Sequence, residues 1–133
     1  MIIGIDPGRD KCGLVLVKEE NQIVVQTVVE TNDLINRIKE LDNDYNIDRI
    51  IIGDGTLSSE IVERIRINYN SEVKIEVIDE TGSTLEAREL YWQENPPKNW
   101  RRLIPISFQT PPRPIDDYAA LVLVKRFLAK SKE

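Results

Sequence analysis

The first 30 residues contain three apolar segments, and their close spacing restricts the fold more than any other feature of the chain. Residues 2–5, 13–18 and 22–30 each have the length and the β-branched composition of a strand. The connections, at 7–12 and at a polar turn over 18–21, are too short for the crossover that parallel neighbours need. The three segments therefore predict an antiparallel arrangement, in which the wholly apolar segment 2–5 is a central strand buried on both faces.

After residue 30 the spacing of the apolar residues becomes helical. A helix containing Leu34 precedes an apolar strand at 47–53, and a second helix from Ser58 precedes an alternating strand at 73–78. A strand reached through a helix lies parallel to its neighbour, and the crossover is right-handed. The order predicts an α/β fold: a mixed five-stranded sheet, three antiparallel strands followed by two parallel ones, with helices on both faces.

The C-terminal third of the chain combines two helices with a long irregular segment. A third helix is predicted from Ser83 and a last one from near Ile115. Between them, residues 94–114 carry six of the seven prolines, so a regular element is not expected there. A connection of this length is typical of a functional loop or of local disorder. No repeat or linker interrupts the chain, which predicts a single domain over 1–133.

The residue types that are missing exclude several kinds of active site. The chain has no histidine and one cysteine, Cys12. A Ser-His-Asp or Cys-His mechanism within one chain is excluded, and so is an ordinary zinc site. Carboxylates are abundant, and their hard oxygen ligands suit Mg²⁺ or Mn²⁺. With no apolar run near the ~20 residues of a membrane span and no signal-peptide pattern, we expect a cytoplasmic protein without membrane contact.

Acidic residues follow three of the predicted strands and open the last helix. Asp6 ends the first strand, Asp54 follows the fourth, and Glu80 follows the fifth. Because the first, fourth and fifth strands are predicted to run parallel, their carboxyl ends meet at one sheet edge, where α/β sheets place ligands. Asp116 and Asp117 could join this edge, although about 100° separates adjacent helical residues and favours only one of the two. A turn role for Asp6 and Asp54, and helix-dipole stabilisation for the two helical acids, are the alternatives.

Three segments in order along nearly the whole chain resemble a known family. They are "IIGIDPGRDKCGLVLV", "VIDETGSTLEA" and "PIDDYAALVLV". Together they are similar to the YqgF/RuvX-type Holliday junction resolvases of the RNase H-like superfamily, and the first is also similar to RuvC. The resemblance implies a catalytic and metal-binding triad at Asp6, Glu80 and Asp116. It also implies an endonuclease that uses two Mg²⁺ (or Mn²⁺) ions on branched DNA or precursor ribosomal RNA.

The chain departs from the family pattern at two places beside these residues. Thr81 stands where the family has an arginine after its Asp-Glu pair. Gly53-Asp54-Gly55 replaces a glycine, a hydrophobic residue and a proline. We therefore add Asp54 to the candidate metal ligands as a neighbour of Asp6, and we keep Asp117 in the wider candidate set.

Charge is distributed unevenly, which bears on the partner. The net charge is −5, but residues 1–80 hold 9 basic and 17 acidic side chains whereas residues 81–133 hold 9 and 6. Arginines near aromatic residues in and before the irregular segment suit phosphates and unstacked bases. The candidate nucleic-acid-binding residues are Arg88, Lys98, Trp100, Arg101, Arg102 and Arg113. Ordinary surface variation, with the tryptophans covering the core, is the alternative.

Three classes of protein remain open at this point. The first is the metal-dependent nuclease, which could act as a homodimer on a symmetric junction. The second is a non-catalytic RNase H-like module that binds nucleic acid or assists ribosome assembly; Thr81 and the acidic net charge favour it. The third is a sugar-kinase or actin-like ATPase, since "GIDPGRDKCG" also resembles its phosphate loop. That fold needs two such domains, whereas 133 residues supply one.

Overall fold

The computed structural model describes residues 1–18 and 22–132. The elements in chain order are β1 (Ile2–Asp6), β2 (Lys11–Val17), β3 (Ile23–Glu30), η1 (Thr31–Asp33), α1 (Leu34–Asp44), β4 (Arg49–Gly53), α2 (Ser58–Asn68), β5 (Lys74–Ile78), α3 (Ser83–Glu94), η2 (Asn99–Leu103), η3 (Ile106–Phe108) and α4 (Asp116–Ser131). Residues 19–21 of the expected turn lie outside the described residues.

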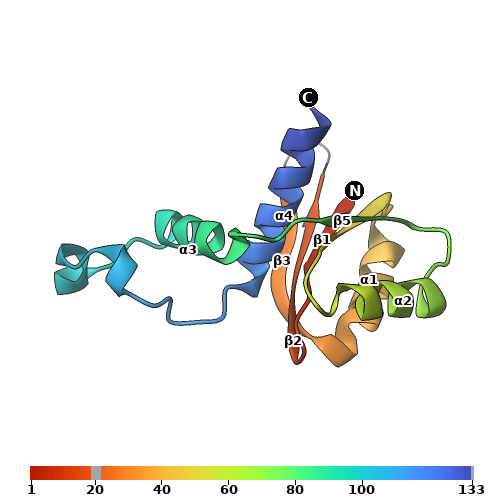
Figure 1. Ribbon diagram of the computed structural model, residues 1–133, viewed down its shortest axis with the longest axis horizontal. Coiled ribbons are helices and arrows are strands. Elements are labelled where there is room, and N and C mark those ends of the chain that lie inside the picture. Colours follow the sequence, from red (N-terminus) through yellow and green to blue (C-terminus); the bar gives the residue numbers. More distant parts are fainter. Residues whose placement is uncertain (19–21, 133) are drawn as a thin grey trace.

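The five strands form one mixed sheet in the order β3-β2-β1-β4-β5 (Figure 1). β1 and β3 each lie antiparallel to β2, whereas β4 lies parallel to both β1 and β5. In this register Asp6 is opposite Gly13 on β2, and Ile5 is beside Ile52 on β4. The predicted α/β sheet, with three antiparallel strands followed by two parallel ones, is confirmed.

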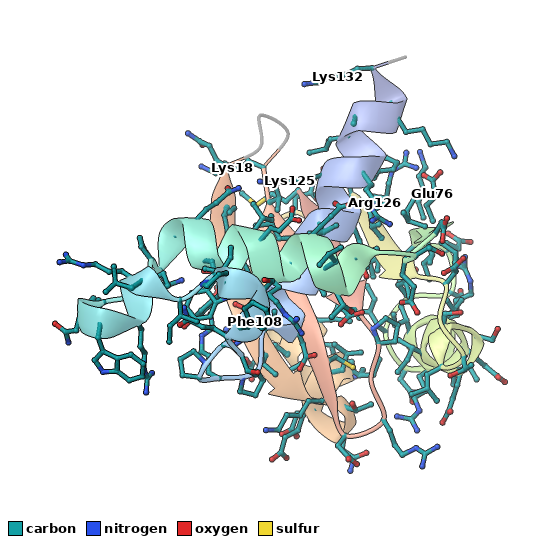
Figure 2. All side chains as sticks on the ribbon, turned by 60° about the vertical axis from the view of Figure 1, so that its left-hand side comes forward. Lys18, Glu76, Phe108, Lys125, Arg126 and Lys132 are labelled. Carbon is teal, nitrogen blue, oxygen red and sulfur yellow. The ribbon has the colours of Figure 1, made fainter. Side chains whose placement is uncertain are left out.

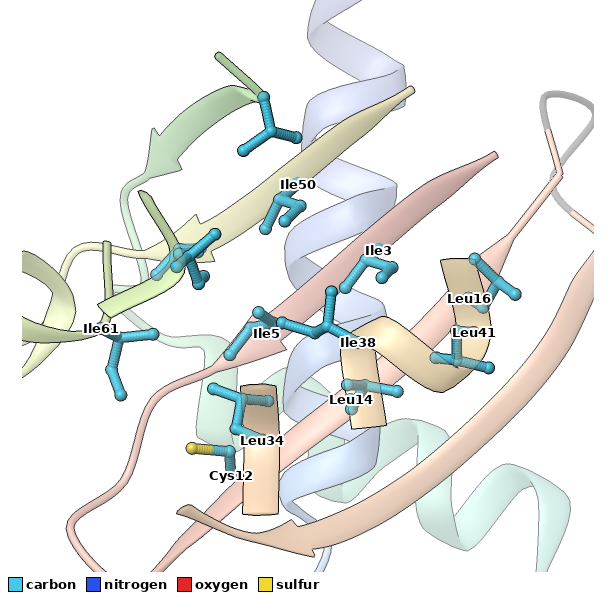
Figure 3. Packing of buried hydrophobic residues seen from close by; sticks show 13 residues of the cluster. Ile3, Ile5, Cys12, Leu14, Leu16, Leu34, Ile38, Leu41, Ile50 and Ile61 are labelled. Carbon is cyan, nitrogen blue, oxygen red and sulfur yellow. The ribbon is translucent and has the colours of Figure 1, made fainter. Parts of the chain in front are cut away.

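Helices cover both faces of the sheet, as predicted. On one face, α1 contributes Leu34, Ile38 and Leu41 to a core shared with Ile3 and Ile5 of β1 (Figure 3). These three helical residues recur at intervals of four and three, so they form one stripe that faces the sheet. α2 adds to the same core. Alternation along the strands then sends Ile2, Val15 and Ile51 to the opposite face, where they pack against α4.

The third helix takes a position that the strand order alone did not predict. α3 packs against α4 through a cluster of Ala87, Tyr91, Tyr118, Ala119 and Val122. α4 therefore has one side on the sheet and another on α3, which explains why its residues 117–124 are all buried.

The segment between α3 and α4 is irregular, as its prolines predicted. It extends away from the sheet and returns to the start of α4 (Figure 1). We call residues 95–115 the arm. Within the described part of the chain, no helix combines the length and the apolar character that crossing a membrane requires.

Candidate active site

Asp6, Glu80 and Asp116 come together at one edge of the sheet. Asp6 is the last residue of β1, Glu80 lies two residues beyond β5, and Asp116 is the first residue of α4. The pKa of Asp6 is raised to about 7, mainly because the carboxyl is buried and also because Asp116 and Glu80 place negative charge beside it. The topology thus brings the carboxyl groups of Glu80 and Asp116 within electrostatic range of Asp6.

Gly53 at the end of β4 and Gly55 two residues later make room for Glu80. A Cβ atom on Gly53 would lie 2.6 Å from Glu80 Oε2, and one on Gly55 would lie 2.5 Å from Oε1. The Gly55 N–H also donates a hydrogen bond to the Glu80 carboxylate, which lowers its pKa. Burial and the charge of Asp54 outweigh that bond, so the pKa is raised overall. A side chain at position 53 or 55 would thus displace the Glu80 carboxylate, and at 55, where the pattern of the resembling family has proline, glycine leaves this space open.

Asp54 supports the turn that carries Glu80. Its Oδ1 atom accepts a hydrogen bond of 3.1 Å from the Glu80 backbone N–H, and its own N–H donates to the Ile78 carbonyl at 3.0 Å. Asp54 is exposed, and its charge raises the pKa of Glu80. The structure thus connects Asp54 to Glu80, and its direct binding of a metal stays a prediction.

Asp116 is held where α4 begins close to β2. A Cβ atom on Gly13 would lie 1.7 Å from the Asp116 carbonyl oxygen, so only glycine fits at this point of the strand. Burial and the neighbouring charge of Asp117 raise the pKa of Asp116, while Lys11 at the start of β2 lowers it. Lys11 is therefore a cation near the carboxyl groups that the sequence did not single out.

The second acid of α4 has a different environment. Asp117 is 3% exposed, and its Oδ1 and Oδ2 atoms accept hydrogen bonds of 3.0 and 3.2 Å from Nη1 and Nη2 of Arg113. Gln26 Nε2 donates a third bond of 3.0 Å to Oδ2. Asp117 was a candidate metal ligand and Arg113 a candidate nucleic-acid-binding residue, but in the structure they bind each other. Both carboxylate oxygens of Asp117 already accept hydrogen bonds.

The carboxyl groups at this edge have the right chemistry for a hard divalent cation, but they form a loose group. Across residues 1–18 and 22–132, no three acidic or cysteine side chains are close enough together to hold a metal ion directly. In the same ranges Asp6, Glu80 and Asp116 make no salt bridge with lysine or arginine. The negative charge near Asp6 is therefore poorly neutralised, which is the condition that a bound cation relieves.

Apart from Arg113, which is paired with Asp117, the candidate nucleic-acid-binding residues fall into two settings. Lys98, Trp100, Arg101 and Arg102 are exposed on the arm. Arg88 is half-buried on α3, and its Nε atom is buried without a hydrogen-bond partner among the described residues. The arm thus supplies the accessible cations.

Arg126 of α4 contacts the turn where the family arginine is missing. Its Nη1 donates to the Asp79 carbonyl at 2.8 Å, and its Nη2 pairs with Glu86 at 2.7 Å. Asp79 in turn accepts a bond of 2.9 Å from the Thr81 N–H, which lowers the pKa of Asp79. Arg126 is 47 residues from Asp79 in sequence, so no local pattern could have indicated this contact.

Comparison with known proteins gives a structural likeness. No protein-family model matches the chain, and no curated protein matches it in sequence. The structure of Thermus thermophilus RuvC superimposes with a TM-score of 0.57 at 17% identity, covering 98% of this chain and 95% of RuvC. The chain has the RNase H-like fold of RuvC. A proposed sugar kinase from Cytophaga hutchinsonii matches with a TM-score of 0.46 at 19% identity. The match covers 68% of this chain and only 39% of the kinase.

Proposed function

We propose that this protein is a divalent-cation-dependent endonuclease that cleaves structured nucleic acid, either branched DNA or precursor ribosomal RNA. The observation that carries the proposal is the carboxyl cluster of Asp6, Glu80 and Asp116, contributed by three separate segments at the carboxyl edge of parallel strands. The RuvC-like fold supports the proposal, as does the resemblance of three sequence segments to the YqgF/RuvX-type resolvases.

The same three residues would hold Mg²⁺ or Mn²⁺. A pair of such ions supplies an activated water and stabilises the leaving oxygen in phosphodiester hydrolysis. The chain's own contribution is to orient the carboxylates. The Glu80 side chain is placed by Gly53 and Gly55, and the contact of Gly13 with Asp116 fixes the start of α4. Because the three groups are loosely arranged, cation binding would draw their side chains together.

A cleavage assay tests the proposal. The protein is incubated with Mg²⁺ or Mn²⁺ and labelled four-way junctions, flaps and structured RNA, beside Asp6→Asn and the matched control Asp10→Asn. Asp10 is an exposed acid of the following loop. Cleavage by the wild type and by the control, but not by Asp6→Asn, supports the nuclease. Absence of both cleavage and calorimetric cation binding would overturn it. Light scattering on the junction complex tests the homodimer.

A second candidate function is a non-catalytic module that binds nucleic acid in the cytoplasm. The loose carboxyl group and Thr81 in place of the family arginine favour this alternative. It requires that the protein bind junctions or structured RNA with equal affinity in Mg²⁺ and in EDTA, without cleavage.

A further inference from the structure

The arm is a small folded unit rather than an extended connection. Gln109 Nε2 donates hydrogen bonds of 2.9 Å to the carbonyl oxygens of both Arg101 and Ile104. The Ile104 N–H donates to the Arg101 carbonyl at 3.1 Å, and η3 lies between these contacts and Gln109. The two short helical turns of the arm are thereby joined to each other.

Both ends of the arm are attached to the first turn of α4. At its start, Asn95 Nδ2 donates to the Tyr91 carbonyl at 3.0 Å and to the Tyr118 hydroxyl at 3.3 Å. At its end, Arg113 pairs with Asp117 and lies 5.4 Å from the centre of the Tyr118 ring. The arm is therefore held beside the helix turn that carries Asp116.

The charge of the arm is opposite to that of the rest of the molecule. Residues 95–115 contain four basic side chains and neither aspartate nor glutamate. The rest of the chain holds 14 basic and 23 acidic residues, a net charge of −9. An arm of this kind attracts a polyanion such as a nucleic acid.

A cavity of about 630 Å³ lies between α3 and the arm. Aromatic side chains from both sides contribute to its lining, namely Tyr91, Trp92 and Trp100. Amide and hydroxyl groups of Asn95, Asn99, Gln109 and Thr110 line it as well, together with the cations Lys98 and Arg101. This volume lies within the range of small-molecule sites.

Two features of the lining suit a planar, hydrogen-bonding guest. Trp100 is 65% exposed, so much of its ring is accessible, and Arg101 lies 5.7 Å from the centre of that ring. The Trp92 ring lines the same cavity, and its Nε1 atom is buried below the accessible surface. Aromatic faces stack on bases, and amides bind the edges of bases that are not paired.

From these observations we propose that the cavity between α3 and the arm binds an unpaired nucleobase, with the adjoining phosphates on Lys98 and Arg101. The inference rests on the proposed function and names its substrate class: nucleic acid that offers an unstacked base, as at a branch point or loop, rather than continuous duplex. Because the arm is attached beside Asp116, a base in this cavity places the neighbouring strand near the carboxyl groups.

Intrinsic fluorescence gives a direct test, because the chain has only two tryptophans and both line the cavity. Wild-type protein in EDTA is titrated with a single-stranded oligonucleotide and with the matching blunt duplex. We expect the single strand to quench the tryptophan emission and the duplex to leave it almost unchanged. Equal quenching by both, or by neither, would overturn the proposal.

Variants locate the effect. Trp100→Ala should weaken single-strand binding about tenfold in an anisotropy assay and leave duplex binding nearly unchanged, because stacking on one base is lost. Trp100→Phe should restore most of the affinity. The control is Phe108→Ala: Phe108 is 82% exposed on the same arm and does not line the cavity (Figure 2). Arg102→Ala should weaken the binding of the single strand and of the duplex alike, and it should reduce the salt dependence of both affinities.

The outcomes separate this inference from the nuclease proposal. All binding is measured without divalent cation on uncleaved ligands, so loss of nuclease activity leaves the test intact. If the protein cleaves nucleic acid but Trp100→Ala keeps the preference for single strand over duplex, the base site is overturned and the nuclease proposal stands. A dimer in light scattering that Phe108→Ala or Trp100→Ala converts to monomer would assign the arm to a second copy of the chain and also overturn it.

Discussion

Arg113 and Asp117 form a bidentate ion pair at the point where the arm meets α4. Two nitrogens of the guanidinium lie 3.0 and 3.2 Å from the two carboxylate oxygens, and the carboxylate is almost completely buried. The same guanidinium lies 5.7 Å from the centre of the Tyr91 ring and 5.4 Å from the centre of the Tyr118 ring. The pair therefore joins the arm, the α3–α4 cluster and the helix turn that presents Asp116.

Removing the arginine should destabilise the fold measurably. Arg113→Ala leaves a buried carboxylate without its main partner, which costs about 1–3 kcal/mol in free energy of unfolding. Urea denaturation checks this value. The matched control is Arg37→Ala, whose exposed pair with Glu40 is expected to contribute less than about 1 kcal/mol. Equal losses in the two variants would contradict a structural role for Arg113.

The raised pKa of Asp6 predicts a specific pH dependence for the cation-free protein. Its pKa in the folded state is about 7, against about 4 in an unfolded chain. Between these values the folded state retains a proton that the unfolded state has released. The contribution of Asp6 to the free energy of unfolding therefore falls as pH rises from about 4 to 7. Above about pH 7 this contribution of Asp6 no longer changes with pH. Urea denaturation in EDTA should show the decline for the wild type and a weaker one for Asp6→Asn.

The neighbouring acids should control the same titration. Asp116→Asn removes one of the two negative charges that raise the pKa of Asp6, so the midpoint of the Asp6 carboxyl resonance should fall in a carbon-detected NMR titration. Asp10→Asn, in the exposed loop, provides the control and should leave the midpoint in place. An Asp6 midpoint near 4 in the wild type would show that the carboxyl groups are not coupled.

Two glycine substitutions separate the site from the fold. Gly55→Ala meets the end of the flexible Glu80 side chain, so we expect a nearly unchanged Tm and a several-fold loss of Mn²⁺ affinity by calorimetry. Gly13→Ala meets the rigid Asp116 backbone and should cost at least about 1–3 kcal/mol of stability in urea denaturation. Unchanged cation affinity in Gly55→Ala would remove Glu80 from the candidate ligands.

Arg126 offers a test of the turn that carries Glu80. Arg126→Ala removes its bonds to the Asp79 carbonyl and to Glu86, so the turn should become more mobile and cation affinity should fall about two- to tenfold. Lys125→Ala is the control, since Lys125 is an exposed neighbour on the same helix (Figure 2). Calorimetry and hydrogen exchange at residues 79–82 provide the measurements. Equal effects of the two substitutions would indicate a general charge effect.

The strands and the carboxyl cluster were predictable because they depend on short-range patterns. Apolar runs fix the strands, the length of each connection fixes its direction, and parallel strands bring Asp6 and Glu80 to one edge. The partners of Asp54 and Arg126 were not predictable, since each side chain bonds a backbone group 26 or 47 residues away. Arg113 precedes α4, so helical spacing gave no reason to pair it with Asp117.

The contribution of Asp116 by the last helix has a consequence for the order of assembly. A chain that emerges from the ribosome presents its N-terminal part first. The meander and both crossovers are complete once β5 has been made. When the turn after β5 has followed, Asp6 at the end of β1 and Glu80 in that turn are both present. The third carboxyl group arrives only when α4 covers β1 and β2. An unfinished chain would thus carry an incomplete site, so any cutting of nucleic acid would be withheld until synthesis has passed the last helix.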